Sequence, residues 1–149
     1  MSNTLENIFN QADVKFCKGL QALSNADKSR IEPISPSHLD GSANIDACLK
    51  KKYPESSRWD YAVAYEGTVY FIEVHPPNEI KEVVKKLHWL KSWLEGYVDL
   101  NNLKSTTCPF TLITTKPIKR NPQTQKMLRD AKNRESLTIK ENHWKAFPK

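Results

Sequence analysis

The alternation of apolar and polar residues is clearest between positions 58 and 75, where the chain reads RWDYAVAYEGTVYFIEVH. Val, Ile, Tyr, Phe and Trp are frequent in this stretch, and Glu66-Gly67 lies at its centre. β-Branched and aromatic residues on both sides of a two-residue turn are typical of a β-hairpin. Pro76 and Pro77 end the second strand, because neither residue can donate a ladder hydrogen bond. The pattern therefore predicts two antiparallel strands joined by a tight turn.

Apolar residues at helical spacing predict an amphipathic helix on each side of this hairpin. Short apolar segments predict further strands, and most of residues 24–43, rich in Ser, Pro, Asp and Gly, is expected to be loop. Besides the hairpin, the predicted elements are helices at 5–23, 44–52, 79–97 and 121–132, and strands at 30–34, 109–115 and 136–140. Their order predicts an α/β protein in which helices cover a sheet.

The length of 149 residues predicts one domain spanning residues 1–149. No apolar run approaches the length of a membrane span, and the N-terminus has no pattern of a secretory signal, so we expect no membrane association. Cys17, Cys48 and Cys108 are odd in number, widely spaced and without a CxxC pair, which favours free thiols and a cytoplasmic location. The net charge of +6 is compatible with a polyanionic partner.

Two carboxylates of the predicted hairpin form a candidate metal site. If the turn uses only Glu66 and Gly67, Asp60 faces Glu73 across the two strands, with Cβ atoms roughly 5 Å apart. His75 lies two residues beyond Glu73, so its side chain points to the same face. Two like charges placed opposite each other need a cation between them, and carboxylate oxygens are suitable ligands for Mg²⁺ or Mn²⁺. Solvated carboxylates at strand ends are the alternative interpretation.

These residues resemble a known superfamily. The order α-β-β-β-α-β, with Asp60 in RWDYAV and Glu73-Val74-His75 in YFIEVH, is similar to the PD-(D/E)XK nucleases of the restriction-endonuclease-like fold. The resemblance covers roughly residues 5–115. It implies a three-layer domain with a mixed sheet flanked by helices, a Mg²⁺ or Mn²⁺ ion bound by Asp60 and Glu73, and hydrolysis of phosphodiesters. In that superfamily an acidic residue of the first helix sometimes joins the site, and Glu6 or Asp13 is the nearest candidate here.

The sequence departs from the superfamily pattern at the basic position. His75 stands where lysine is usual, and Trp59 precedes Asp60 where proline is usual. Neutral imidazole can position water or act as a base, but it does not supply the fixed charge of lysine. Lys85 or Lys81, on the helix that follows, could replace that lysine by position, as migrated lysines do in some relatives. The candidate catalytic residues are therefore Asp60, Glu73, His75 and Lys85.

Two functions follow from these observations. The first is nucleic-acid binding, with DNA favoured over RNA, accompanied by Mg²⁺-dependent endonuclease activity; the basic segment KPIKR at 116–120 could contact phosphates. The alternative is a catalytically inactive protein-binding module, either a partner of the immunity or antitoxin kind or a subunit of a complex. Trp89 and Trp93, four residues apart on one helix, are then its candidate contact surface, although such a pair commonly packs within the fold.

Overall fold

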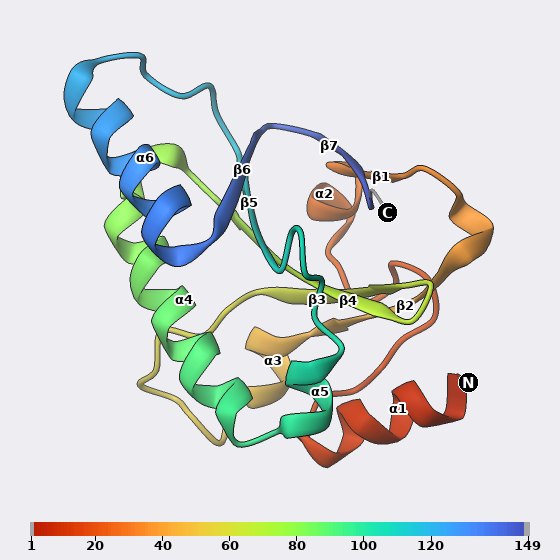
Figure 1. The fold of residues 1–149 in the computed structure, drawn as a ribbon. Helices are drawn as coiled ribbons and strands as arrows, with labels where there is room; N and C mark the ends of the chain where they lie inside the picture. The colour runs from red at the N-terminus through yellow and green to blue at the C-terminus, as the bar shows by residue number, and fades with distance from the viewer. Residues whose placement is uncertain (1, 148–149) are drawn as a thin grey trace.

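The computed structural model describes residues 2–147 (Figure 1). It confirms an α/β fold with a mixed five-stranded sheet flanked by helices. The helices are α1 (Ser2–Gln11), α2 (Asn25–Lys28), η1 (Pro36–His38), α3 (Ile45–Leu49), η2 (Pro77–Glu79), α4 (Ile80–Glu95), α5 (Val98–Asn102) and α6 (Pro122–Glu135). The strands are β1 (Ile31–Pro33), β2 (Leu39–Asn44), β3 (Tyr61–Tyr65), β4 (Thr68–His75), β5 (Phe110–Thr114), β6 (Leu137–Glu141) and β7 (Trp144–Ala146).

The five strands of the main sheet lie in the order β2-β3-β4-β5-β6. β3 is antiparallel to both of its neighbours, whereas β4, β5 and β6 are parallel to one another. The predicted hairpin register is confirmed, since Tyr65 pairs with Thr68 and Tyr61 pairs with Ile72. Glu66 and Gly67 both have positive φ, at 50° and 78°, as a tight two-residue hairpin turn requires.

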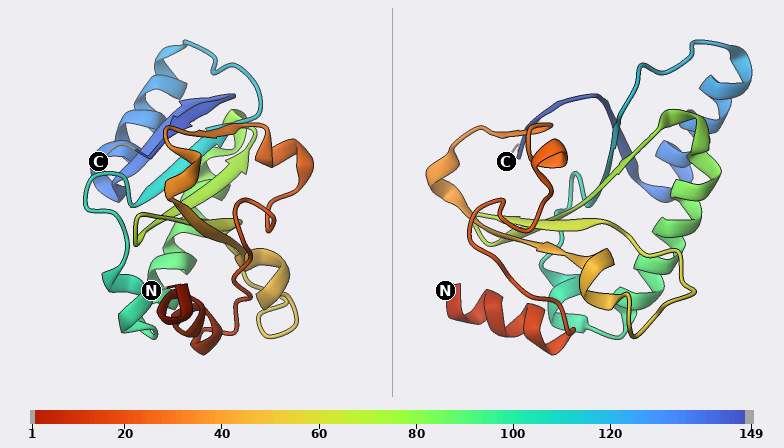
Figure 2. Two further views of the ribbon diagram at one scale, coloured as in Figure 1. Left: turned by 90° about the vertical axis from the view of Figure 1, so that its right-hand side faces the viewer. Right: turned by 180° about the vertical axis from the view of Figure 1, so that it is seen from behind.

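The helices α1, α3, α4, α5 and α6 all contribute to the core on one face of the sheet. The apolar stripe of α4 packs there against Ala62 and Ala64 of β3 and Phe71 of β4. This face also receives the side chain of Glu73, because alternate residues of a strand point to the same side. Figure 2 shows α4 and α6 lying side by side along the sheet.

The opposite face of the sheet has a different cover. A separate parallel pair of strands, β1 and β7, packs over it together with the segment around α2. Phe147 stacks on Tyr65 at a ring separation of 5.1 Å, and Trp144 of β7 contacts Tyr70 edge to face. In the part of the chain that the structure describes, no helix has the length and apolar character needed to cross a membrane, and the three cysteines are free, as predicted.

The helix predicted over residues 5–23 is wrong beyond Gln11. The chain reverses at Asp13, whose φ is 61°, and the amide of Val14 donates to the carbonyl of Phe9 at 3.1 Å. Phe16 then lies over α1 and stacks on Phe9. This packing explains why apolar residues continue at helical spacing beyond Gln11, although the backbone there is not helical. The predicted loop before residue 43 contains β2, which pairs with β3.

A close approach of backbone to backbone requires glycine at position 41. A Cβ atom there would lie 2.5 Å from the carbonyl oxygen of Cys17 and 2.5 Å from the ring of Phe16. We expect Gly41→Ala to reduce the free energy of unfolding by about 1–3 kcal/mol, because the segment at Cys17 must move away from β2. Urea unfolding measures this, with Gly96→Ala as the control, since the nearest atom there is 3.5 Å away. Equal midpoints for the two variants would contradict the packing described here.

Candidate functional site

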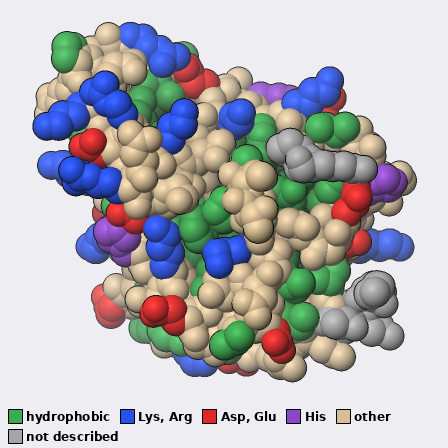
Figure 3. Space-filling model, in the orientation of Figure 1, with side chains coloured by type: hydrophobic (Ala, Val, Ile, Leu, Met, Phe, Trp, Pro, Cys, Tyr) green, Lys and Arg blue, Asp and Glu red, His purple; other side chains and the backbone are tan. Residues whose placement is uncertain are grey.

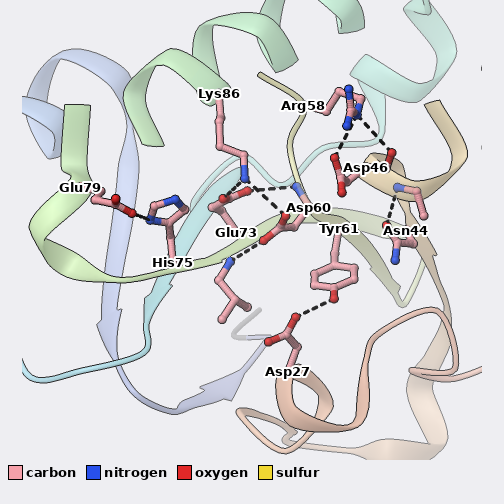
Figure 4. A network of polar contacts seen from close by, with 12 residues as sticks. Asp27, Asn44, Asp46, Arg58, Asp60, Tyr61, Glu73, His75, Glu79 and Lys86 are labelled. Atoms are coloured by element: carbon pink, nitrogen blue, oxygen red, sulfur yellow. Dashed lines mark hydrogen bonds and ion pairs between the residues drawn. The ribbon is translucent and has the colours of Figure 1, made fainter. Parts of the chain in front are cut away.

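Asp60, Glu73 and Lys86 converge on the helix-covered face of the sheet (Figure 4). Asp60 immediately precedes β3, and its carbonyl accepts from the amide of Ile45 at the start of α3, at 2.9 Å. Glu73 lies within β4 on the same side as Phe71, facing the core. Lys86 reaches down from α4 to both carboxylates. Three successive segments, whose residues follow one another at intervals of 13 positions, therefore bring two acidic groups and one basic group together.

The two carboxylates are held in place by backbone amides. Glu73 Oε1 accepts from the amide of Asp60 at 3.0 Å, and Asp60 Oδ2 accepts from the amide of Val74 at 3.0 Å. These reciprocal bonds cross the two strands at the positions where the predicted register places Asp60 opposite Glu73. The remaining oxygens meet Lys86, whose Nζ contacts Glu73 Oε2 and lies 3.4 Å from Asp60 Oδ1. The backbone amides of Asp60 and Val74 therefore fix the positions of both carboxylates.

The site is buried and carries an excess of negative charge. The side chain of Glu73 is 0% exposed, that of Lys86 15% and that of Asp60 20%. Burial raises the pKa of Glu73 well above its usual range, and the neighbouring Asp60 raises it further. Burial also raises the pKa of Asp60, against the opposing effect of Lys86. When both carboxyl groups are ionised, one ammonium balances only one of the two negative charges, so a proton or a further cation can supply the other positive charge.

Lys86 remains protonated in this arrangement. Burial disfavours its charged form, but the two carboxylates outweigh that effect and raise its pKa. An ammonium with a raised pKa is a poor general base near neutral pH. Its chemistry is that of a fixed cation, which can hold a phosphate oxygen or orient a water molecule.

The other predicted basic residues lie elsewhere. Lys85 is exposed, and within residues 2–147 it makes no contact with the two carboxylates. His75 ends β4 on the predicted face, but its Nδ1 lies 3.4 Å from Glu79 Oε1 and 3.3 Å from the carbonyl of Pro76. Figure 4 shows His75 joined to Glu79 and not to the cluster. Lys81 is exposed beside α6.

Sequence reasoning missed Lys86, although the spacing along α4 identifies it. Val83 and Leu87 are buried and define the inward face of the helix. At about 100° per residue, Lys85 lies roughly 160° from Val83 around the helix, whereas Lys86 lies only about 60° away, beside the buried stripe. Only the second position lets a long side chain extend from the edge of the stripe toward the sheet.

The acidic candidates of the first helix do not join the site. Glu6 is an exposed residue of α1, and Asp13 pairs with Lys52 at 3.2 Å. A different acidic residue, Asp46 of α3, adds to the negative potential at Asp60. Asp46 is held by Arg58, whose Nε donates to Asp46 Oδ1 at 2.9 Å (Figure 4). Arg58 also donates to the carbonyl of Tyr53 at 2.6 Å and so fixes the segment that leads to Asp60.

The tryptophan pair on α4 is part of the packing. The rings of Trp89 and Trp93 stack with centroids 5.8 Å apart and an interplanar angle of 9°. Trp93 is buried against Tyr97, and Trp89 meets Tyr53 edge to face. Both rings thus fix the end of α4 and the segment after α3.

The donor set suits a hard divalent cation better than a soft one. Among residues 2–147, no group of three or more His, Cys, Asp and Glu side chains is placed to hold a metal ion. Mg²⁺ usually binds proteins through only one or two carboxylates and completes its shell with water and substrate phosphates. Asp60 and Glu73 fit that requirement in number, because they present two carboxylates, whose outer oxygens now meet Lys86.

Comparison with family models, with curated proteins and with solved structures gives no match.

Proposed function

We propose that this protein is a nucleic-acid-binding domain of the PD-(D/E)XK nuclease type, which cleaves phosphodiesters with Mg²⁺ or Mn²⁺. The observation that carries this proposal is the convergence of Asp60, Glu73 and Lys86 from a strand start, a strand interior and the following helix. If α2, β1, η1, α3, η2 and α5 are treated as additions, the remaining order α1-β2-β3-β4-α4-β5 matches the α-β-β-β-α-β core of the restriction-endonuclease-like fold and supports the proposal. Mixed strand directions across the sheet are also in keeping with that fold.

Each residue of the cluster has a distinct role in this proposal. Asp60 and Glu73 would hold the divalent ion through the oxygens that now face Lys86. The bound ion would lower the pKa of a water molecule and offset charge on the phosphate. Lys86 would position the attacking water or a phosphate oxygen by its charge, and the amides of Asp60 and Val74 keep both carboxylates oriented.

A basic surface lies near the same end of the sheet. β4 and β5 run parallel, with His75 beside Thr114, so the loop after β5 emerges at the end of the sheet where Glu73 and His75 lie. That loop contributes Lys116, Lys119 and Arg120, and Figure 3 shows further Lys and Arg side chains gathered over α6. A nucleic-acid backbone bound along this surface would be directed toward Asp60 and Glu73.

Salt dependence tests the role of this surface. We expect Lys116→Glu/Lys119→Glu to weaken binding of a DNA duplex and to reduce the slope of log K against log salt by up to about 2, since each phosphate contact releases about one counterion. Lys50→Glu/Lys51→Glu is the matched control, because these exposed lysines lie at the end of α3 and carry the same charge. Fluorescence anisotropy at several salt concentrations measures both quantities. Equal slopes for the two double variants would show that the loop after β5 does not contact the DNA.

A second candidate function is favoured by one contact. Lys86 already supplies a cation to both carboxylates, so the cluster can persist as a structural ion triad without a metal. In that case the protein is a catalytically inactive binding module, of the immunity or antitoxin kind or a subunit of a complex. The deciding experiment is Mn²⁺-supported cleavage of plasmid and single-stranded DNA by the wild type beside Asp60→Asn.

A further inference from the structure

The two edge strands of the main sheet, β2 and β6, differ in their backbone pairing with the rest of the chain. At the β2 edge, Cys17 and Ser42 exchange backbone hydrogen bonds of 2.7 and 2.8 Å, so the chain itself pairs with this edge at Ser42. β6 forms the other edge and pairs with β5 on one side. Within residues 2–147 no strand or bridge pairs with its outer side. An edge of this kind offers free backbone donors and acceptors.

A groove of about 730 Å³ follows this free edge. Four consecutive residues of β6, from Thr138 to Glu141, line it together with residues of α6. Successive side chains of a strand point to opposite faces, so a groove lined by all four runs along the strand edge itself. Ile118, Leu128 and Ile139 supply its apolar surface. The groove therefore offers the outward backbone groups of β6 together with an apolar surface for the side chains of a partner.

The charges around the groove are mainly positive. Arg129, Lys132 and Lys140 line it, and in the described part of the chain none of the three forms an ion pair. The one carboxylate in the lining, Glu141, is engaged by Arg120. A partner lying in the groove would thus meet three uncompensated cations.

We propose that this groove binds an extended acidic segment of a partner protein, which adds a strand to the outer edge of β6. A peptide backbone alternates donors and acceptors and so complements the free edge, whereas a phosphodiester backbone has only acceptors there. Acidic side chains of the segment on the face of α6 meet Arg129 and Lys132, and acidic side chains on the opposite face meet Lys140. Apolar side chains of the segment on the face of α6 contact Ile139 and Leu128. This interaction is separate from the carboxylate cluster.

Selection from a random library of peptides of about six residues, the usual length of a strand, tests the proposal. The full-length wild type is the bait, and Arg129→Glu/Lys132→Glu is used for counter-selection. We expect enriched peptides to combine Asp or Glu with β-branched residues. A synthetic copy of an enriched peptide should bind the wild type at least about tenfold more tightly than this double variant. Lys50→Glu/Lys51→Glu, with the same change of charge at α3, should bind as the wild type does.

Backbone methylation of the peptide distinguishes strand addition from simple charge attraction. N-methyl groups on alternate residues, placed on either edge in two separate peptides, should weaken binding about tenfold for one peptide only. Amides of residues 137–141 that face outward should exchange more slowly with the peptide bound. Equal binding of all methylated forms would overturn the proposal, as would selection without acidic enrichment. Binding of a short single-stranded oligonucleotide that is lost in Arg129→Glu/Lys132→Glu, with no peptide binding, would instead assign the groove to nucleic acid.

Discussion

Asp60→Asn and Glu73→Gln are each expected to reduce Mn²⁺-supported cleavage of plasmid DNA to the level seen in chelator, a loss of about a thousandfold or more. Both substitutions keep the size of the side chain and remove one of the two carboxylates that would hold the ion. The fold should persist, because the oxygen of the new side-chain amide can still accept a backbone hydrogen bond. At position 60 this bond comes from the amide of Val74, and at position 73 it comes from the amide of residue 60. Cleavage is measured from the rate of supercoil loss, with circular dichroism to confirm that each variant is folded.

His75 provides the control that separates two interpretations of the basic position. Because its imidazole meets Glu79 and not the carboxylate pair, His75→Ala should retain most of the cleavage activity. Lys86→Met should lose cleavage activity, since it removes the one ammonium that contacts both carboxylates among residues 2–147. Loss with His75→Ala and retention with Lys86→Met would assign the role to His75. Wild-type cleavage equal to that of Asp60→Asn would mark the activity as contamination and favour the inactive module.

The hairpin and its carboxylate pair could be predicted because both depend on local rules. Strong β-formers around Glu66-Gly67 fix a two-residue turn, and the turn alone sets the register that places Asp60 opposite Glu73. β2 could not be predicted in this way, since Leu39–Asn44 contains Asp, Gly, Ser and Asn, which are poor strand formers. It is a strand because β3 and the segment at Cys17 pair with it on either side.

The basic member of the cluster could not be assigned from motif spacing. Motif spacing placed the cation at His75, Lys81 or Lys85, because it counts residues along the chain. The position of Lys86 depends instead on how α4 is rotated against the sheet, which the buried residues Val83 and Leu87 determine. The packing of Trp89 and Trp93 also depends on tertiary structure. Their rings stack on each other and contact tyrosines because of the arrangement of α4 and the segment after α3.

Lys86→Met is expected to lower the free energy of unfolding by about 3–5 kcal/mol at neutral pH in the presence of a chelator. The substitution fills a similar volume but leaves two carboxylates, 0% and 20% exposed, facing each other without a cation. Lys85→Met is the matched control one residue away. Its ammonium is exposed and touches neither carboxylate, so its effect should stay within about 0.5 kcal/mol. Urea unfolding of the two variants beside the wild type measures the difference.

The pH dependence of the Lys86→Met deficit has a definite sign. Burial and Asp60 raise the pKa of Glu73 in the folded protein, so the folded state binds that proton more tightly than the unfolded state does. The associated stability is complete below the unfolded pKa and is lost as the pH rises through the folded pKa. Without Lys86 to favour the ionised form, the deficit should therefore be smaller at about pH 5 than at about pH 8. A deficit independent of pH would indicate lost packing and not lost charge.

Mn²⁺ decides whether the destabilised cluster is a metal site. If Asp60 and Glu73 bind the ion, it should take the place of the missing ammonium and restore stability, by about 2.7 kcal/mol at a concentration one hundred times the dissociation constant. The double variant Asp60→Asn/Lys86→Met should show no such gain, because one of the two carboxylates is absent. Restoration confined to Lys86→Met would support the nuclease proposal independently of any cleavage assay. Failure of Mn²⁺ to stabilise either variant would leave Lys86 as a structural counter-ion and make the inactive binding module the better account.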